Sequence, residues 1–461
     1  MTDFPALLAP DRGQPAQRVR LVAEAEMAAF RESLGETARA AVAAAGFAGR
    51  PDSAVFLPED GGGWSLAVGL GREAAAGRWT LAAAAAALPA GTYRLEGPAG
   101  PHAAHGWLMA QHRFDRYRRA EDQRGARQLL VAPHLVDRAV ADAAAAAALR
   151  DMVDTPAEDM GPDDIEAAVR ELAGRFDAAV EAVSGEALLE RNLPLIHAVG
   201  RASPRRPRLV MLDWTAGPDL PLLVLVGKGV AFDSGGLNLK TGGSMALMKK
   251  DMGGAAHALM LARLVMERRL PVRLKLLVAA ADNMVAGNAL RPGDVITSRK
   301  GLSVEVGNTD AEGRLLLADA LALASETGPA LILDFATLTG AARVALGPEL
   351  PALFANDDGV AAALLEAGAA ADDALWRLPL WAPYAEMFRS TIADLNNNAE
   401  GGMAGAITAA LFLERFVAPG TAWAHLDLYA WSGSARPGRP KGGAATGLFA
   451  ALGFLERRFA A

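Results

Sequence analysis

The sequence predicts an α/β fold with two domains, a smaller N-terminal α/β domain and a larger C-terminal one with a largely buried central sheet and helices on both faces. Two observations carry this prediction. The chain has 461 residues, which is more than one typical domain contains. Short apolar runs also alternate with helical segments along the chain, as in sheets that are covered by helices.

The N-terminal domain is expected at residues 1–133, where Ala-rich segments separate short apolar runs such as 65–70. A linker helix is expected over residues 134–155, because the Ala-rich stretch within it contains no Gly or Pro. The pattern ends at Pro156, which disfavours helical geometry in the residue before it.

The C-terminal domain is expected to span residues 156–461, where strand, loop and helix patterns follow one another. Three fully apolar runs are typical of strands that are buried on both faces; they lie at residues 222–226, 276–280 and 330–333. Helical patterns lie at residues 254–268 and 315–326. Ligands usually bind at loops beyond the ends of such strands, so functional residues are expected there.

Composition restricts the kind of site that this chain can form. It contains no Cys, which excludes disulfides and thiolate metal sites. A net charge of -7 and a pI of about 5.6 provide no general attraction to nucleic acid or anionic membranes. The N-terminus lacks a signal-peptide pattern, and the longest apolar stretches are too short to cross a bilayer. A cytoplasmic protein without a membrane partner is expected.

Charged residues gather at two places in the C-terminal domain. They are Lys228, Asp233, Lys240 and Asp251 in a glycine-rich segment, and Asp310, Glu312 and Arg314 about eighty residues later. The chain has seven Lys against 39 Arg, and four of those Lys fall between positions 228 and 250. Lys, unlike Arg, can lose its proton and offer a lone pair to a metal. The retention of Lys here therefore favours a metal site.

The four carboxylates predict two metal ions rather than one. Carboxylates that converge at the edge of an apolar sheet repel one another and raise each other's pKa values unless cations balance them. Two divalent ions carry four positive charges and would balance the four carboxylates. Asp310 and Glu312 would share one face if their segment is extended. Carboxylates with one amine suit Mn²⁺ or Zn²⁺, so a two-metal hydrolytic site is predicted.

Some of these residues also have simpler interpretations. Residues 227–229 follow a strand pattern, but they lack the spacing of a phosphate-binding loop. Asp251 alone, at the start of a helix pattern, would be read as a helix cap. His257 and His425 belong to no metal-binding motif and are expected to be core or hydrogen-bonded residues.

Two segments resemble the signatures of the leucyl (cytosol) aminopeptidases. Residues 227–236 read GKGVAFDSGG, and residues 308–315 read NTDAEGRL. Further agreement lies at residues 282–284, 291–294 and 337–341, so the resemblance covers roughly residues 150–461. The N-terminal part has no such specific match, although members of this family carry a variable α/β domain there.

The resemblance implies ligands for two metal ions. A readily exchanging ion would be held by Asp233, Glu312, and the side chain and backbone carbonyl of Asp310. A tighter ion would be held by Lys228, Asp233, Asp251 and Glu312. Asp233 and Glu312 would then bridge the ions, and Lys228 would be deprotonated, as two adjacent cations favour.

The resemblance also implies a reaction and an assembly. A metal-activated water would attack the scissile carbonyl, and protonated Lys240 would stabilise the resulting oxyanion. Arg314 would hold a bicarbonate ion that serves as the general base. The free α-amine of a peptide substrate would bind a metal, which restricts cleavage to the first residue. A homohexamer is expected, as the family forms.

Several positions depart from the usual pattern of that family. Asp154 and Asp282 stand where Asn and Glu are common, and Asn238 replaces a small hydroxyl residue. Residues 429–447 are unusual, and in the family this region helps to line the side-chain pocket. The catalytic assignment survives these changes, whereas a preference for leucine does not follow.

Three other functions fit the sequence less well than the aminopeptidase. A two-metal phosphoesterase is disfavoured by the Lys ligand and by the absence of His, and an inactive paralogue by the presence of every inferred ligand. A nucleic-acid-binding regulator would use a cluster of Arg residues in the N-terminal domain. Acidic residues are interspersed in this cluster, and this mixture of charges favours a solvated face or a subunit contact instead. The cluster consists of Arg113, Arg116, Arg118, Arg119, Arg124 and Arg127, with Asp115, Glu121 and Asp122 among them.

Overall fold

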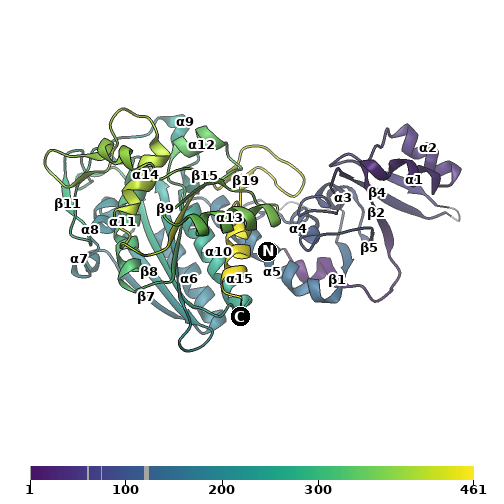
Figure 1. The fold of residues 1–461 in the computed structure, drawn as a ribbon, viewed down its shortest axis with the longest axis horizontal. Coiled ribbons are helices and arrows are strands. Elements are labelled where there is room, and N and C mark those ends of the chain that lie inside the picture. Colours follow the sequence, from purple (N-terminus) through teal and green to yellow (C-terminus); the bar gives the residue numbers. More distant parts are fainter. Residues whose placement is uncertain (1, 60–61, 74, 119–123, 461) are drawn as a thin grey trace. The chain divides into compact units, whose positions relative to one another are not determined.

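The computed structural model describes residues 2–59, 62–73, 75–118 and 124–460, and it divides into two compact units (Figure 1). Unit 1 comprises Met1–Ala147 and Ser434–Lys441, and unit 2 comprises Ala148–Gly433 and Gly442–Ala461. Both units are α/β, as predicted. The division falls within helix α5 (Val136–Asp154), close to the middle of the expected linker.

Unit 1 is built on a six-stranded sheet with the order β1-β6-β5-β2-β4-β3. The strands are β1 (Leu8–Pro10), β2 (Gln17–Ala23), β3 (Ala54–Pro58), β4 (Trp64–Gly71), β5 (Gly91–Glu96) and β6 (Arg127–Val131). All neighbours are parallel except β3 and β4. The helices are α1 (Met27–Glu32), α2 (Glu36–Ala44), α3 (Ala82–Ala87) and α4 (Ala103–Met109). Apolar residues of α1 and α2 pack against β2, β3 and β4 in one core cluster.

Unit 2 is built on an eight-stranded sheet with the order β15-β14-β17-β13-β9-β10-β8-β7. The strands are β7 (Ala179–Ser184), β8 (Arg208–Thr215), β9 (Leu222–Asp233), β10 (Arg273–Asn283), β13 (Leu331–Ala336), β14 (Ala352–Ala355), β15 (Trp376–Arg377) and β17 (Trp423–Asp427). The central strands β17, β13, β9 and β10 are parallel. Small sheets are formed by β11 (Val295–Thr297), β12 (Ser303–Glu305) and β16 (Leu395–Asn396), and by β18 (Trp431–Ser432) and β19 (Gly442–Gly443).

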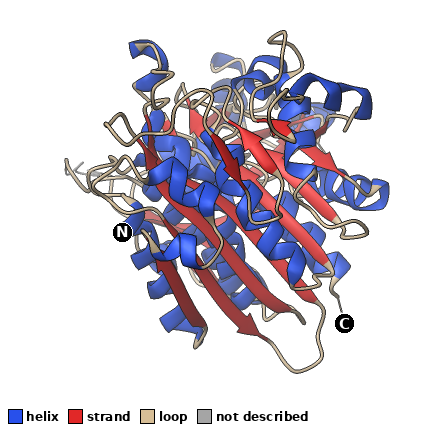
Figure 2. Cartoon of the chain, turned by 90° about the vertical axis from the view of Figure 1, so that its left-hand side faces the viewer, coloured by secondary structure: helices blue, strands red, loops and turns tan. Residues whose placement is uncertain are grey.

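Helices cover both faces of this sheet (Figure 2). The described helices of unit 2 are α6 (Pro162–Phe176), α7 (Ala187–Glu190), α8 (Pro194–Gly200), α9 (Gly242–Met245), α10 (Gly253–Glu267), α11 (Glu312–Glu326), α12 (Gly340–Leu346), α13 (Asp358–Ala370), α14 (Gly405–Glu414) and α15 (Leu448–Arg458). Val224 and Val226 belong to the same core cluster as α8 and α11, and Leu223 and Leu225 are also fully buried. Because successive side chains of a strand point to opposite faces, β9 is covered on both.

The predicted strands and helices of unit 2 lie within the observed ones or within a residue of their ends, but β9 is longer than its apolar run. The strand continues through Gly227 and Gly229 to Asp233. A Cβ atom at Gly227 would lie 2.7 Å from Ala255 Cα, so glycine lets α10 pack closely on β9. Lys228 therefore lies inside a strand, and the expectation of a loop or strand end is wrong for this residue. Among the described residues, no helix is both long and apolar enough for a bilayer crossing.

Candidate metal centre

The carboxyl-terminal half of β9 carries the first two side chains of the site. Lys228 pairs with Ala279 of β10 within the sheet, and Asp233 is the last residue of the strand. Both side chains are buried. Helix α11 begins close to Lys228, since a Cβ atom at Gly313 would lie 2.6 Å from Lys228 Cε. Glycine at position 313 therefore makes room for the lysine side chain.

Lys228 joins carboxylates from two distant segments. Its Nζ lies 2.7 Å from Asp251 Oδ2 and 2.8 Å from Glu312 Oε1, and it donates a hydrogen bond to Thr337 O at 3.1 Å. Burial opposes the charge of Lys228, but Asp251 and Glu312 outweigh burial and raise its pKa. Thr337 Oγ1 donates to Asp251 Oδ1 at 2.7 Å and so fixes that carboxylate. The amine nitrogen thus lies among the carboxylate oxygens.

Lys240 joins the other two carboxylates. Its Nζ lies 2.8 Å from Asp233 Oδ2 and 2.5 Å from Asp310 Oδ1. The Lys240 side chain is 14% exposed, against 3% for Lys228, so it is the lysine that solvent and small molecules can reach. Burial opposes its charge, yet the pKa of Lys240 is raised by Asp233 and Glu312.

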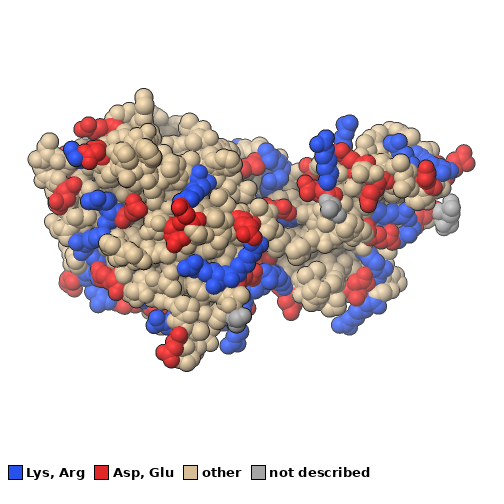
Figure 3. Space-filling view, in the orientation of Figure 1, with Lys and Arg blue, Asp and Glu red and all other residues tan. Residues whose placement is uncertain are grey.

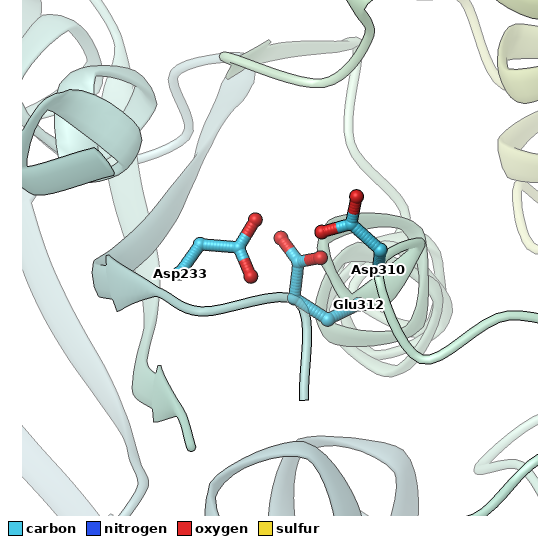
Figure 4. Close-up of side chains that lie close together, drawn as sticks. All are labelled: Asp233, Asp310 and Glu312. Atoms are coloured by element: carbon cyan, nitrogen blue, oxygen red, sulfur yellow. The ribbon is translucent and has the colours of Figure 1, made fainter. Parts of the chain in front are cut away.

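Three carboxylates converge closely enough to share a metal ion. Asp233, Asp310 and Glu312 each offer an oxygen, and these oxygens lie within 4.8 Å of one another (Figure 4). Asp310 lies in a turn and Glu312 is the first residue of α11. The segment is therefore not extended, and an extended strand is not what places the two side chains on one face. The start of the helix brings the two carboxylates together instead. Asp251, from the short 3₁₀ helix before α10, reaches the group through Lys228.

The electrostatics of the group fit divalent cations. Burial, followed by the charge of Asp233, raises the pKa of Glu312 to about 8. Burial and Asp251 likewise raise the pKa of Asp233. Carboxylates whose ionised form is disfavoured in this way gain most from a nearby cation. Carboxylate oxygens with one amine nitrogen are a donor set that suits Mn²⁺ or Zn²⁺.

Two asparagines connect the loops that carry these side chains. Asn283 Nδ2, at the end of β10, donates to Asp233 Oδ1 at 2.8 Å and to Thr309 O at 3.0 Å. Asn238 Oδ1 accepts from Thr309 N at 2.8 Å, and Asn238 N donates to Thr309 Oγ1 at 2.8 Å. The unusual Asn238 therefore ties the loop before Lys240 to the loop that carries Asp310.

Arg314 lies in the first turn of α11 and is half-buried. One guanidinium nitrogen, Nη1, donates to Asn397 O at 2.6 Å. Nε is buried and has no hydrogen-bond partner among the described residues. Burial lowers the pKa of Arg314 to about 10, although Glu312 opposes this shift. A guanidinium whose buried Nε–H has no partner in the described part of the chain is suited to an anion.

The other unusual acidic residues serve the fold. Asp282 forms an ion pair with Arg205 at 2.8 Å and accepts from Ser203 Oγ at 2.9 Å. Asp154 Oδ1 accepts from Gly443 N at 2.7 Å. Within the described residues, neither carboxylate pairs with a candidate metal ligand.

The two singled-out histidines are fully buried and hydrogen-bonded, as predicted. His257 Nδ1 lies 2.7 Å from Gly253 O, and its Nε2 accepts from Thr446 N at 3.2 Å. His425 Nδ1 lies 2.5 Å from Asp334 Oδ1, and the ring stacks on Trp423. Neither ring belongs to the metal centre.

Sequence reasoning missed a group beside the centre. Lys250 directly precedes Asp251, is 5% exposed, and lies with its Nζ 4.7 Å from the centre of the Tyr429 ring. Arg343 Cζ lies 5.0 Å from the same ring. Burial lowers the pKa of Lys250 to about 8, although Asp251 opposes this shift. The high local density of Lys was the signal that could have identified it.

The Arg cluster of unit 1 is only partly described. Arg119, Glu121 and Asp122 lie outside the described residues. Arg127 is 1% exposed and donates to Gly125 O and Ala85 O, so it serves the fold. The described arginines of this cluster therefore do not form one continuous exposed surface. Acidic and basic side chains also alternate over the face seen in Figure 3.

Comparison with known proteins identifies the family. The sequence profile of the "Cytosol aminopeptidase family, catalytic domain" matches residues 147–452. This chain belongs to the cytosol aminopeptidase family. The profile "M17 aminopeptidase, N-terminal domain" matches residues 18–131, a part in which the motifs alone had indicated no relative.

Individual relatives agree with this membership. The "Probable cytosol aminopeptidase" of Roseiflexus castenholzii is 43% identical over 359 residues, which are 74% of this chain and 73% of that protein. The crystal structure of the cytosol aminopeptidase from Coxiella burnetii has a TM-score of 0.93 and 41% identity, and the match covers 98% of this chain and 99% of that one. The bottromycin maturation enzyme BotP in complex with Mn has a TM-score of 0.85 and 35% identity, covering 96% and 100%. The chain is thus a leucyl-aminopeptidase-like metallo-exopeptidase that uses divalent metal.

Proposed function

We propose that this protein removes the N-terminal residue from peptides with the aid of two divalent ions, Mn²⁺ or Zn²⁺. The observation that carries the proposal is the convergence of four carboxylates and two lysines at the end of β9. One ion would be held by Asp233, Asp310 and Glu312. The other would be held by Lys228, Asp233, Asp251 and Glu312.

Lys228 can act as a ligand only after losing its proton. Its Nζ already lies within 2.8 Å of oxygens of Asp251 and Glu312, which are proposed ligands of the same ion. The charges of these carboxylates raise its pKa, so binding of the ion exchanges a proton for the metal. Asp233 and Glu312 would contact both ions, which explains why burial of these two carboxylates is tolerated.

When bound, the two ions would supply Lewis acidity for the scissile carbonyl and would activate the attacking water. Lys240 would keep its proton and place its ammonium near the oxygen that becomes negative in the tetrahedral intermediate. Its contacts with Asp233 and Asp310 place it on the more exposed side of the carboxylates. The Asn238–Thr309 hydrogen bonds would hold the loop that carries it.

Arg314 would hold a bicarbonate ion, which would supply the general base that the chain itself lacks. Two features support this role. Its Nε–H is buried with no partner among the described residues, and neither His257 nor His425 contacts the four proposed metal-ligand carboxylates. The bond from Nη1 to Asn397 O would orient the guanidinium.

The expected substrate is a peptide with a free N-terminus, and the expected assembly is a homohexamer in the cytoplasm. A free α-amine would coordinate a metal ion and so place the first peptide bond at the centre. The assembly is tested by light scattering, which should give about six times the 47.9 kDa of one chain.

The decisive experiment uses aminoacyl p-nitroanilides after dialysis against a chelator. Activity should be lost and should return with Mn²⁺ or Zn²⁺. N-acetylated analogues should resist cleavage while the free forms are cut. Efficient cleavage of acetylated substrates would contradict an aminopeptidase, and full activity after complete metal removal would contradict the metal site.

A further inference from the structure

One β-hairpin near the C-terminal end of the chain belongs partly to each unit. Its strands β18 (Trp431–Ser432) and β19 (Gly442–Gly443) pair with each other in unit 2, whereas Ser434–Lys441 between them belong to unit 1. We call residues 431–443 the hairpin and residues 434–441 its tip. The chain therefore leaves unit 2 after residue 433 and returns to it at residue 442.

The tip contains a tight turn that its sequence favours. Arg436 N donates to Arg439 O at 2.8 Å, and Arg439 N donates to Arg436 O at 2.9 Å. Pro437 and Gly438 lie between them, and Gly438 has a φ of 70°. Pro followed by Gly with a positive φ is the signature of a type II turn. Pro440 also has a restricted φ, so the tip loses little conformational entropy when it packs on unit 1.

The tip packs on unit 1 where helix α3 begins. A Cβ atom at Gly438 would lie 3.1 Å from both Ala82 Cβ and Trp79 Cζ3, so the backbone of the tip approaches these side chains closely. Arg439 Cζ lies 4.9 Å from the centre of the Trp79 ring. Trp provides the most favourable ring face for a cation. Unit 1 therefore holds the tip by close packing and by one cation–π contact.

The base of the hairpin packs on segments of the metal centre. Ala430, directly before β18, accepts from Ala444 N at 3.0 Å. A Cβ atom at Gly253, the first residue of α10, would lie 2.4 Å from Ala430 Cβ and 3.1 Å from Thr337 Cγ2. Gly253 follows Asp251 by two residues, and Thr337 Oγ1 donates to Asp251 Oδ1 at 2.7 Å. Ala430 therefore borders the segments that carry and fix a proposed metal ligand.

The unusual Asp154 fixes the second strand of the hairpin. Its Oδ1 accepts from Gly443 N at 2.7 Å. A Cβ atom at Gly442 would lie 2.5 Å from the same oxygen, and the φ of Gly442 is 137°, which favours glycine. Two departures from the family pattern, at position 154 and within residues 429–447, thus lie in direct contact.

We propose that docking of the tip on unit 1 keeps the base of the hairpin ordered beside the metal centre, so that Arg439 is a positioning residue for substrate binding. This inference rests on the proposed aminopeptidase function. A peptide held at the metals would lie against the ordered base. Apparent affinity falls with the fraction of molecules that are competent to bind. Release of the tip should therefore raise KM and leave kcat unchanged, because the bound complex is the same.

The kinetic test uses Leu p-nitroanilide as the substrate. Arg439→Ala should raise KM about 3- to 10-fold, the range for one lost cation–π contact, and should change kcat by less than about twofold. Trp79→Ala should also raise KM. The double variant should raise KM no further than Arg439→Ala does, because both substitutions remove the same contact. Arg439→Lys should recover most of the wild-type KM, since an ammonium can also lie over the ring.

Limited proteolysis with trypsin provides a readout that does not depend on activity. Arg436 and Arg439 each precede a proline, which prevents tryptic cleavage, so Lys441–Gly442 is the tryptic bond of the tip. Gly442 is buried beside Asp154, and cleavage therefore requires local opening of the hairpin. Mass spectrometry should show faster cleavage of this bond in Arg439→Ala than in the wild type, and Arg439→Lys should restore the slower rate.

Arg458→Ala is the matched control. Arg458 Cζ lies 5.9 Å from the centre of the Phe454 ring at the end of α15, outside the hairpin. This variant should match the wild type in KM and in cleavage after Lys441. Because Arg439 lies on a loop, its two variants keep the test decisive if Trp79→Ala does not fold.

Three results would overturn the positioning role of Arg439. They are an unchanged KM and cleavage rate in Arg439→Ala, effects of Arg439→Ala and Trp79→Ala that add in the double variant, and a loss of kcat or metal content in Arg439→Ala. Failure of the wild type to cut any free aminoacyl anilide would instead overturn the aminopeptidase function, and trypsin would still report whether the tip is docked.

Discussion

Replacement of Lys240 by Ala separates catalysis from metal binding. The ammonium lies 2.8 Å from Asp233 Oδ2 and 2.5 Å from Asp310 Oδ1, and it is proposed to stabilise the oxyanion of the tetrahedral intermediate. An interaction made mainly in the transition state lowers kcat far more than it raises KM when it is removed. The Lys240 side chain is 14% exposed, so bulk water replaces its charge poorly. We therefore expect kcat to fall by about 10²–10³, the range for one lost oxyanion donor.

Replacement of Lys228 should have a different effect. Lys228 is a proposed metal ligand, and its side chain is only 3% exposed. Lys228→Ala should therefore lower metal content as well as activity. Lys228→Arg should also have low metal content and low activity, because a guanidinium offers no lone pair and the close approach of Gly313 to Lys228 Cε leaves little space for a larger side chain.

The assay combines steady-state kinetics on Leu p-nitroanilide with elemental analysis of the dialysed protein. Lys275→Ala is the control, since Lys275 pairs with Asp213 near the start of β10, away from the metal centre. This variant should keep wild-type kcat and metal content. If Lys240→Ala loses metal while Lys228→Ala keeps both ions, the two lysines have been assigned the wrong way round.

Three further predictions follow from the described contacts. Glu312→Ala should reduce binding of both ions and Asp251→Ala mainly that of one, so equal losses on elemental analysis would refute the bridging role of Glu312. Asn238→Ala should lower kcat about tenfold, the equivalent of one hydrogen bond, and Asn238→Ser should recover part of it; an unchanged kcat would show that this side chain does not position the loop. Asp334→Asn should lower the free energy of unfolding by about 3–5 kcal/mol, because it breaks a buried ion pair. Burial lowers the pKa of His425, but Asp334 outweighs burial, so the pKa is raised on balance. The difference in unfolding free energy between wild type and Asp334→Asn should therefore be largest below about pH 6.5 and should shrink as the pH rises through the raised pKa. Denaturant titrations that show no such trend would contradict a charged pair.

The central sheet was predictable because its strands are buried on both faces. Such strands read as continuous apolar runs, and the three runs of the sequence lie in β9, β10 and β13, with one residue of the last run preceding β13. The helices α10 and α11 were predictable from long periodic patterns without Pro. Short edge strands such as β15 (Trp376–Arg377) carry no comparable pattern, because two residues cannot show a periodicity.

The extension of β9 could not be predicted from local sequence. Gly227 and Gly229 weaken the strand signal, since glycine has no side chain to pack and a high conformational entropy in the unfolded chain. Pairing with β10 continues through both glycines and on to Asp233, so tertiary contacts outweigh the local propensity. The position of Lys228 within the sheet follows from this pairing.

The proposed metal ligands carry a stronger sequence signal than the residues around them. Asp310, Glu312 and Arg314 lie within five positions, and their density is unusual in any sequence. Lys250, Arg343 and Tyr429 are separated by long stretches of sequence and come together only in the folded chain. A lone cation or aromatic residue carries no signal of this kind.

The choice of Lys over Arg connects these observations. Arg outnumbers Lys by 39 to seven, yet positions 228, 240, 249 and 250 are all Lys. At position 228 the proposed reason is chemical and steric, because a metal ligand needs a lone pair and a Cβ atom at Gly313 would lie 2.6 Å from Lys228 Cε. At position 250 the residue is 5% exposed, and its Nζ lies 4.7 Å from the centre of the Tyr429 ring. The rare residue type in this chain therefore marks the proposed centre that would cut the peptide bond.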